Sequence, residues 1–171
     1  MDDKLVPAHI LFARWFIRIR WVALIILIVS NYAVKHLFNV SIQEVSIYIL
    51  TMVLFVLNVL HAIFLRRITK KGSSKVIPRI KQEIHFQIIT DLIVLTLIIH
   101  YSGGIENPLI LFYFLHMIIA SSIFSTLVSY LYVAFAILLA ALLGLLECYS
   151  FIPHYPMEGF INHDLYKNTL Y

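Results

Sequence analysis

The sequence is poor in cysteine and in charge. Its single cysteine, Cys148, excludes an internal disulfide and any metal site built from several cysteines. Charged residues make up 13% of the chain, whereas soluble globular proteins carry about 25%. With 61% hydrophobic residues and a mean hydropathy of +0.91, the chain lacks the polar surface that a water-soluble domain of this size needs. Lipid is therefore the expected solvent for most of the chain.

Long apolar runs account for this composition. A helix needs about 20 apolar residues to cross a bilayer core about 30 Å thick. Five segments of suitable length are present, at residues 21–38, 42–64, 84–101, 109–125 and 127–149. The fourth and fifth nearly touch, which predicts a tight turn near residues 125–129. The sequence thus predicts an all-α membrane protein, with a polytopic bundle of five transmembrane helices over residues 21–149.

The segments at the two ends of the bundle are more polar. Residues 1–20 combine aromatic side chains with Arg14 and Arg18 on one helix face. This pattern is typical of an amphipathic helix in the headgroup region, and it also fits the charged start of the first span. Residues 150–171 contain two prolines and a glycine, which predicts an extracytoplasmic loop rather than a domain.

The basic residues predict the orientation. Four of the 13 Lys and Arg residues lie in residues 1–20, and seven lie in a predicted loop at residues 65–83. Only Lys35 and Lys167 fall on the opposite side of the five predicted spans. Cytoplasmic loops carry the excess of Lys and Arg, so the N-terminus and the basic loop are expected in the cytoplasm. Because the positive charge follows the membrane topology, nucleic acid is not an expected partner.

A set of polar residues falls inside the predicted spans. Asp91 and Gln87 share one face of the third span, His116 lies at a similar depth in the fourth, and Asn58 lies in the second. An ionisable residue at mid-bilayer costs about 2.5–3.5 kcal/mol or more, so these side chains are expected to face the bundle interior and meet. They form either a proton-linked or ligand-linked switch or a structural hydrogen-bonded contact between helices.

A second polar set lies near the predicted outer face and includes His36, His100, Glu106, Glu147 and His154. No close spacing such as HxxxH supports a metal site, and solvation at the interface is the simpler expectation. On the fifth span, small residues recur every fourth position, at Ala136, Ala140 and Gly144. Such a stripe permits close helix packing, either within the bundle or between two protomers of a homodimer.

The turn between the third and fourth spans reads Ser102-Gly103-Gly104-Ile105-Glu106-Asn107-Pro108. Gly103 and Gly104 can adopt the positive φ that often ends a helix. Asn107 can cap the next helix, and Pro108 suits its first position, where no amide hydrogen is missed. These residues have a complete structural explanation as a turn.

The same stretch also resembles a known family. Gln87, Asp91, Leu95-Thr96, Tyr101, Gly103-Gly104 and Asn107-Pro108 are similar to the membrane sensor region of bacterial histidine kinases, in particular the quinone-responsive RegB-like redox sensors. The resemblance covers essentially the whole chain. Leu109 stands where the family hallmark has phenylalanine, and no counterpart of the redox-active cysteine is present. These departures favour a wider group of kinases that share the membrane module and sense another ligand.

The resemblance implies a sensory input domain of a two-component histidine kinase in a bacterial inner membrane. It implies a quinone or another ligand near Gly103, Gly104, Asn107, Pro108 and His100. It further implies a sixth span beyond residue 171 that leads to a cytoplasmic kinase core, which would supply homodimerisation, catalysis and contact with a response regulator. The chain itself shows no catalytic motif.

Two other functions compete with the sensor. A small transporter or channel subunit would use Asp91 and His116 to line a pathway. An intramembrane enzyme would need a nucleophile with a base or a metal, whereas the sequence offers only scattered histidines.

The predicted orientation can be tested directly. Cysteines introduced within residues 66–81 are expected to react with impermeant reagents from the cytoplasmic side only, because the basic residues hold that loop inside. Labelling of these positions from the external side would contradict both the topology and the sensor assignment.

Overall fold

The structure is a computed structural model, and it describes residues 5–36, 43–70 and 76–155, with side chains described from residue 10 onward. These residues form an all-helical bundle and no strand, which confirms the predicted class. The helices are α1 (Leu5–His36), α2 (Glu44–Lys70), α3 (Val76–Tyr101), α4 (Phe112–Ile123) and α5 (Thr126–Cys148). Two short 3-10 helices, η1 (Gly104–Glu106) and η2 (Pro108–Leu111), connect α3 to α4.

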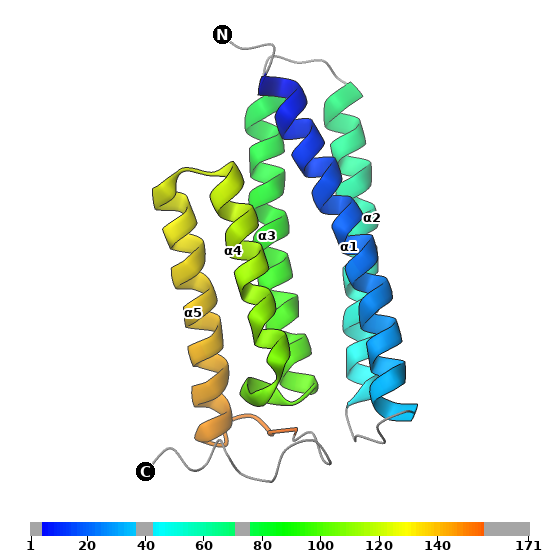
Figure 1. The fold of residues 1–171 in the computed structure, drawn as a ribbon, viewed down its shortest axis with the longest axis vertical. Coiled ribbons are helices and arrows are strands. Elements are labelled where there is room, and N and C mark those ends of the chain that lie inside the picture. The colour runs from blue at the N-terminus through cyan, green and yellow to red at the C-terminus, as the bar shows by residue number, and fades with distance from the viewer. Residues whose placement is uncertain (1–4, 37–42, 71–75, 156–171) are drawn as a thin grey trace.

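Helix α3 occupies the centre of the bundle. In Figure 1, α1 and α2 lie on one side of it, and α4 and α5 lie on the other. Its apolar core positions repeat every fourth residue, at Ile80, Ile84, Ile88 and Leu92, and all four are at most 1% exposed. A polar stripe, Glu83, Gln87 and Asp91, runs beside this apolar stripe and is also buried. Because α3 buries both stripes, its polar side chains must find partners on the neighbouring helices.

Among the residues that the structure describes, three helices are long and apolar enough to cross a membrane, namely α2, α3 and α5. Their outward faces carry large exposed hydrophobic side chains such as Phe55, Leu131 and Leu138, which suit contact with lipid. The apolar segment that contains α4 is shorter, and the count of five spans stays a prediction.

Helix α1 has no break near residue 20. It runs without interruption from Leu5 to His36, because no glycine or proline occurs between Ala8 and His36. Residues 5–20 are therefore continuous with the rest of α1, and residues 1–4 lie outside the described part. Whether residues 5–20 lie in the headgroup region or begin the first span stays a prediction.

The basic loop at residues 65–83 is mostly helical instead. Helix α2 continues to Lys70 and α3 already begins at Val76, so only residues 71–75, outside the described part, separate them. Lys, Arg, Gln and Glu are good helix formers, which lets both helices extend beyond their apolar sections. Pro78 is compatible with this start, because it falls in the first turn of α3, where proline is tolerated.

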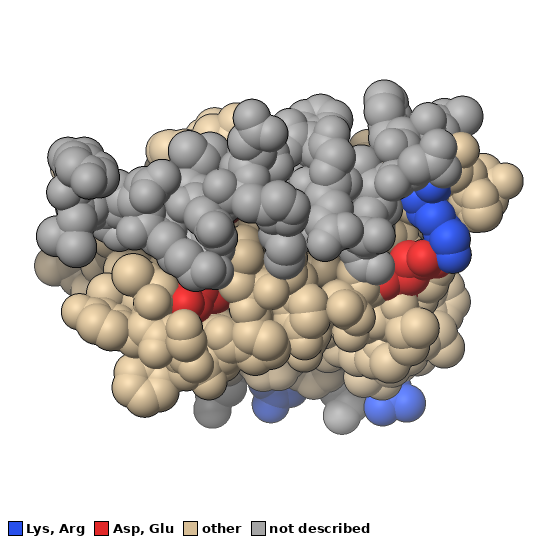
Figure 2. All heavy atoms as spheres, turned by 90° about the horizontal axis from the view of Figure 1, so that it is seen from below, with Lys and Arg blue, Asp and Glu red and all other residues tan. Residues whose placement is uncertain are grey.

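The end of the bundle that contains the turn between α3 and α4 carries little charge in the described part of the chain. Figure 2 views this end and shows few Lys, Arg, Asp or Glu side chains among the residues described. An exposed ion pair joins the last turn of α1 to the start of α2, between Lys35 Nζ and Glu44 Oε1 at 2.6 Å. This agrees with the concentration of Lys and Arg in residues 1–20 and 65–83, at the other end of the bundle.

Helix α4 is shorter than the predicted span at 109–125. It contains 12 residues, about 18 Å of helix, because the chain first forms η2 after Asn107 and leaves the helical conformation at Phe124. The predicted tight turn lies at Phe124–Ser125, since α5 begins at Thr126.

The turn between α3 and α4 has the predicted backbone. Gly103 and Gly104 have φ of 131° and 62°. Asn107 Oδ1 accepts a hydrogen bond from the amide of Leu109 at 2.8 Å, and its Nδ2 donates to the carbonyl of Ser102 at 2.5 Å. Pro108 occupies the first position of η2. The structural explanation of this turn is confirmed.

Two glycines near this turn provide a matched test. A Cβ at Gly104 would lie 2.8 Å from the carboxyl carbon of the buried Glu147, in addition to the unfavourable φ. We expect Gly104→Ala to lower the free energy of unfolding by about 1–3 kcal/mol, as measured by thermal or denaturant unfolding in detergent.

Gly144→Ala is the control. Its Cβ would meet only the Cδ1 of Ile105, at 2.7 Å, which is the far end of a flexible side chain. We expect a change below about 1 kcal/mol, because alanine is also the better helix former. Equal destabilisation by both substitutions would contradict the requirement for glycine at position 104.

Candidate functional site

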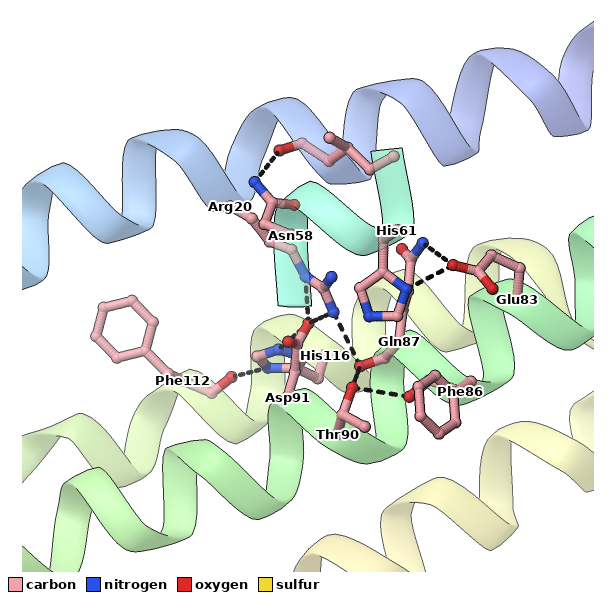
Figure 3. Close-up of polar contacts among 11 residues, drawn as sticks. Arg20, Asn58, His61, Glu83, Phe86, Gln87, Thr90, Asp91, Phe112 and His116 are labelled. Atoms are coloured by element: carbon pink, nitrogen blue, oxygen red, sulfur yellow. Dashed lines mark hydrogen bonds and ion pairs between the residues drawn. The ribbon is translucent and has the colours of Figure 1, made fainter. Parts of the chain in front are cut away.

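A group of buried polar side chains links α1, α2, α3 and α4 in the bundle interior (Figure 3). We call this group the central cluster, and it consists of Arg20, Asn58, His61, Glu83, Gln87, Asp91 and His116. Except for His116, whose side chain is 18% exposed, each residue is at most 8% exposed. Charges buried to this degree require partners or a function.

Arg20 is the main partner of Asp91. The guanidinium donates to Asp91 Oδ2 from Nε at 2.8 Å and lies 2.6 Å from the same oxygen through Nη2. Nη2 also donates to the backbone carbonyl of Gln87 at 3.0 Å, and the guanidinium stacks over Phe16 at 5.1 Å. This pair fastens α1 to α3 with a charge-assisted interaction.

His116 approaches Asp91 from α4. Its Nδ1 donates to the carbonyl of Phe112 at 3.0 Å, and its Nε2 lies 3.7 Å from Asp91 Oδ2. The structure thus brings together the aspartate and histidine that the sequence placed at one depth. At 3.7 Å the contact is an ion-pair distance and too long for a hydrogen bond.

A second polar pair lies closer to the basic end of α3. His61 Nδ1 and Glu83 Oε1 are 2.5 Å apart, and Gln87 Nε2 donates to the same oxygen at 3.2 Å. Gln87 therefore connects the two pairs, because its backbone carbonyl binds Arg20 while its side chain binds Glu83. Asn58, one turn before His61, donates to the carbonyl of Ile17 on α1 at 3.4 Å.

The sequence predicts four of the seven residues in the central cluster and does not predict Arg20, His61 and Glu83. Arg20 belongs to the basic residues that indicate topology, and Glu83 falls in the predicted basic loop. The spacing of Glu83, Gln87 and Asp91 at every fourth residue was a signal for one buried polar face.

The outer polar set is less solvated than expected. Glu147 on α5 is 1% exposed and lies 2.9 Å from His100 Nδ1 and 3.1 Å from His154 Nδ1. The backbone amide of Ile105 donates a hydrogen bond to Glu147 Oε2 at 3.4 Å. The expectation of a solvated set is wrong for Glu147 and His100, because the turn after α3 folds over α5 and covers them. Glu106 is partly buried, and His36 is exposed.

The residues predicted to bind a ligand gather around Glu147. Gly104 packs against its carboxylate, His100 contacts it, and Asn107 uses both ends of its amide within the turn. Pro108 begins η2 and is exposed. Within the described residues, no group of three His, Cys, Asp or Glu side chains is placed to hold a metal ion.

The small residues of α5 are used within the chain. Ala136 is 1% exposed, Ala140 packs against the apolar core, and Gly144 faces Ile105. Packing inside the bundle accounts for the stripe, and a homodimer through it stays a prediction.

An apolar cavity of ≈ 360 Å³ lies between α3 and α5. It is lined by His85, Ile89, Val128, Leu131, Tyr132 and Phe135. His85 Nδ1 is hydrogen-bonded to the Tyr132 hydroxyl, and its ring stacks on Phe124 with centroids 3.9 Å apart. This hydrogen bond occupies one polar atom of each side chain, and the other four lining residues are apolar, so the cavity presents mainly hydrocarbon.

No protein-family model, curated protein or solved structure matches this chain. The fold and the buried site define an all-helical bundle with three helices able to span a membrane and an ionic cluster in its interior.

The Arg20–Asp91 pair generates a stability prediction. Asp91→Asn leaves the buried guanidinium without a counter-charge, so the free energy of unfolding should fall by about 3–5 kcal/mol. The double variant Arg20→Met/Asp91→Leu should recover much of this loss, because it removes both buried charges. Unfolding of the purified protein in detergent measures both.

The exposed pair provides the control. Lys35→Ala should cost no more than about 1 kcal/mol, because its side chain is 47% exposed and solvent screens the interaction. If Asp91→Asn lowered the free energy of unfolding no more than Lys35→Ala does, the buried Arg20–Asp91 pair would not be important for the stability of the bundle.

Proposed function

We propose that this chain is the sensory input module of a bacterial two-component histidine kinase. In this proposal it detects a membrane-soluble or extracytoplasmic signal, such as the redox state of a quinone, and passes a helix displacement to a cytoplasmic kinase core. The resemblance of residues 87–108 to RegB-like sensors supports the class. Localisation in the bacterial inner membrane with a cytoplasmic N-terminus belongs to the same proposal.

One structural observation carries the proposal: α3 is joined to each of the other four helices by a polar side-chain pair. Asp91 binds Arg20 of α1, Glu83 binds His61 of α2, Thr96 binds Tyr113 of α4 at 2.7 Å, and His100 binds Glu147 of α5. A displacement of α3 must exchange or break several of these contacts together. Such a set of discrete contacts favours two alternative arrangements over continuous deformation, as a signalling element requires.

The two ends of α3 have different parts in this proposal. A ligand that binds beside the turn would act on His100 and Glu147, since these two side chains couple the turn to α5. The central cluster would relay the movement to α1 and α2, whose polar ends extend toward the predicted cytoplasmic side. The input and the relay would thus be joined by one rigid helix.

A chimeric kinase tests the proposal. Residues 1–171 would replace the first five spans of a RegB-like kinase, and autophosphorylation would be measured in membrane vesicles with oxidised and reduced ubiquinone or menaquinone analogues. We expect phosphorylation to differ between the two redox states at least several-fold. An Asp91→Asn chimera should give one constant level, because the contact between α1 and α3 is lost.

The matched control is Lys35→Gln at the exposed ion pair, which should respond as the unmodified chimera does. An inserted chimera with the same phosphorylation in both redox states would contradict a quinone signal. Ion flux through proteoliposomes that depends on Asp91 would instead favour the transporter alternative.

A further inference from the structure

The charges of the central cluster do not balance without an additional proton. Glu83 and Asp91 contribute two negative charges, and Arg20, which stays protonated in proteins, contributes one positive charge. The remaining titratable groups that contact them are His61 from α2 and His116 from α4. Helix α5 makes none of these contacts, since its Tyr132 pairs with His85 and its Glu147 with His100. One protonated histidine makes the buried cluster neutral, which avoids the cost of an uncompensated charge.

The buried donors and acceptors that lack a partner favour the His61–Glu83 pair as the place of this proton. Within the central cluster, four buried atoms have no hydrogen-bond partner among the described residues: Arg20 Nη1, Asn58 Oδ1, His61 Nε2 and Gln87 Oε1. All four side chains are at least nine-tenths buried. If His61 Nε2 carries a proton, the four atoms comprise two donors and two acceptors. If it does not, one donor stands against three acceptors, so the protonated form suits the site better.

His116 is the weaker site for the same proton. Its Nε2 is 3.7 Å from Asp91 Oδ2, and that oxygen already accepts hydrogen bonds from Arg20. The distance between His61 Nδ1 and Glu83 Oε1 is 2.5 Å, within direct hydrogen-bond range. A proton on His116 in addition to the one on His61 would give the buried cluster a net positive charge.

We propose that His61 and Glu83 form a proton-binding site that keeps α2 packed against α3. When the site is loaded, one proton is shared by the imidazole and the carboxylate, and the central cluster is neutral. Release of that proton to water leaves one uncompensated negative charge between the two helices and weakens their contact. Glu83 lies seven residues into α3, about 10 Å from its start, so exchange would occur from the basic end of the bundle.

This inference deepens the proposed function, because it makes proton concentration a regulator of the relay between α3 and α2. It does not need the kinase, since proton binding is a property of the chain itself. Failure of the chimera would therefore leave the proton site standing, and failure of the proton site would leave the response to quinone standing.

The test uses the full chain in phosphatidylcholine nanodiscs, with its unfolding midpoint measured from about pH 6 to about pH 9, where a histidine with a carboxylate partner can lose its proton. The wild type should become less stable as the pH rises, because the proton that balances the cluster is lost. In Glu83→Gln/His61→Gln the Arg20–Asp91 pair is already balanced, so the midpoint should change less over the same range than it does in the wild type. His116→Gln should keep the wild-type dependence.

Magnetic resonance of isotope-labelled histidine in the wild-type protein provides a second measurement, which reports the protonation of the ring directly and not through stability. The signal of His61, assigned by its loss in His61→Gln, should be that of an imidazolium at about pH 6 and of a neutral ring at about pH 9. A neutral His61 throughout this range, or a pH dependence as large in the double variant as in the wild type, would overturn the proposal.

Discussion

The burial of two carboxylates on one central helix is the constraint on which the rest of the bundle depends. Glu83 and Asp91 are each 7% exposed and lie two helical turns apart on α3. In a membrane interior each is costly unless a cation stands beside it. Their partners come from two other helices, Arg20 on α1 for Asp91 and His61 on α2 for Glu83, so those helices must pack where α3 requires them. The need to compensate the two buried carboxylates therefore determines where α1 and α2 pack against α3.

Polar contacts have a larger role here than in a soluble bundle of this size. Between helices in lipid, apolar surface gains little by association, because lipid tails are as apolar as leucine. The outward faces of α2 and α5 remain exposed and apolar, while the helices are joined by pairs such as Thr96–Tyr113 and His100–Glu147. Steric fit adds to these pairs, as at Gly104 beneath the Glu147 carboxylate. The bundle is specified by a few directional contacts and the packing around them.

The sequence predicted the helical class, the backbone of the Gly103–Gly104 turn and the approach of Asp91 to His116. It did not predict that Arg20, Glu83 and Glu147 are buried. Each of these stands at the end of an apolar run, where a charged side chain can either extend to the interface or turn inward to a partner. Only the positions of the neighbouring helices decide between these outcomes. A polar stripe such as Glu83, Gln87 and Asp91 does favour the inward one, because three polar residues on a single helix face cannot all reach the interface.

The two polar centres on α3 differ in how completely their hydrogen bonds are satisfied, and this difference bears on how the bundle can move. At the turn, both ends of the Asn107 amide are used, and Glu147 is held by His100 and by the amide of Ile105. In the central cluster, four buried atoms keep unused hydrogen-bonding capacity within the described part of the chain. A fully satisfied network is rigid, whereas a partly satisfied one can exchange partners at lower cost. Helix α3 should therefore pivot about its outer turn, with the rearrangement concentrated where it meets α1 and α2.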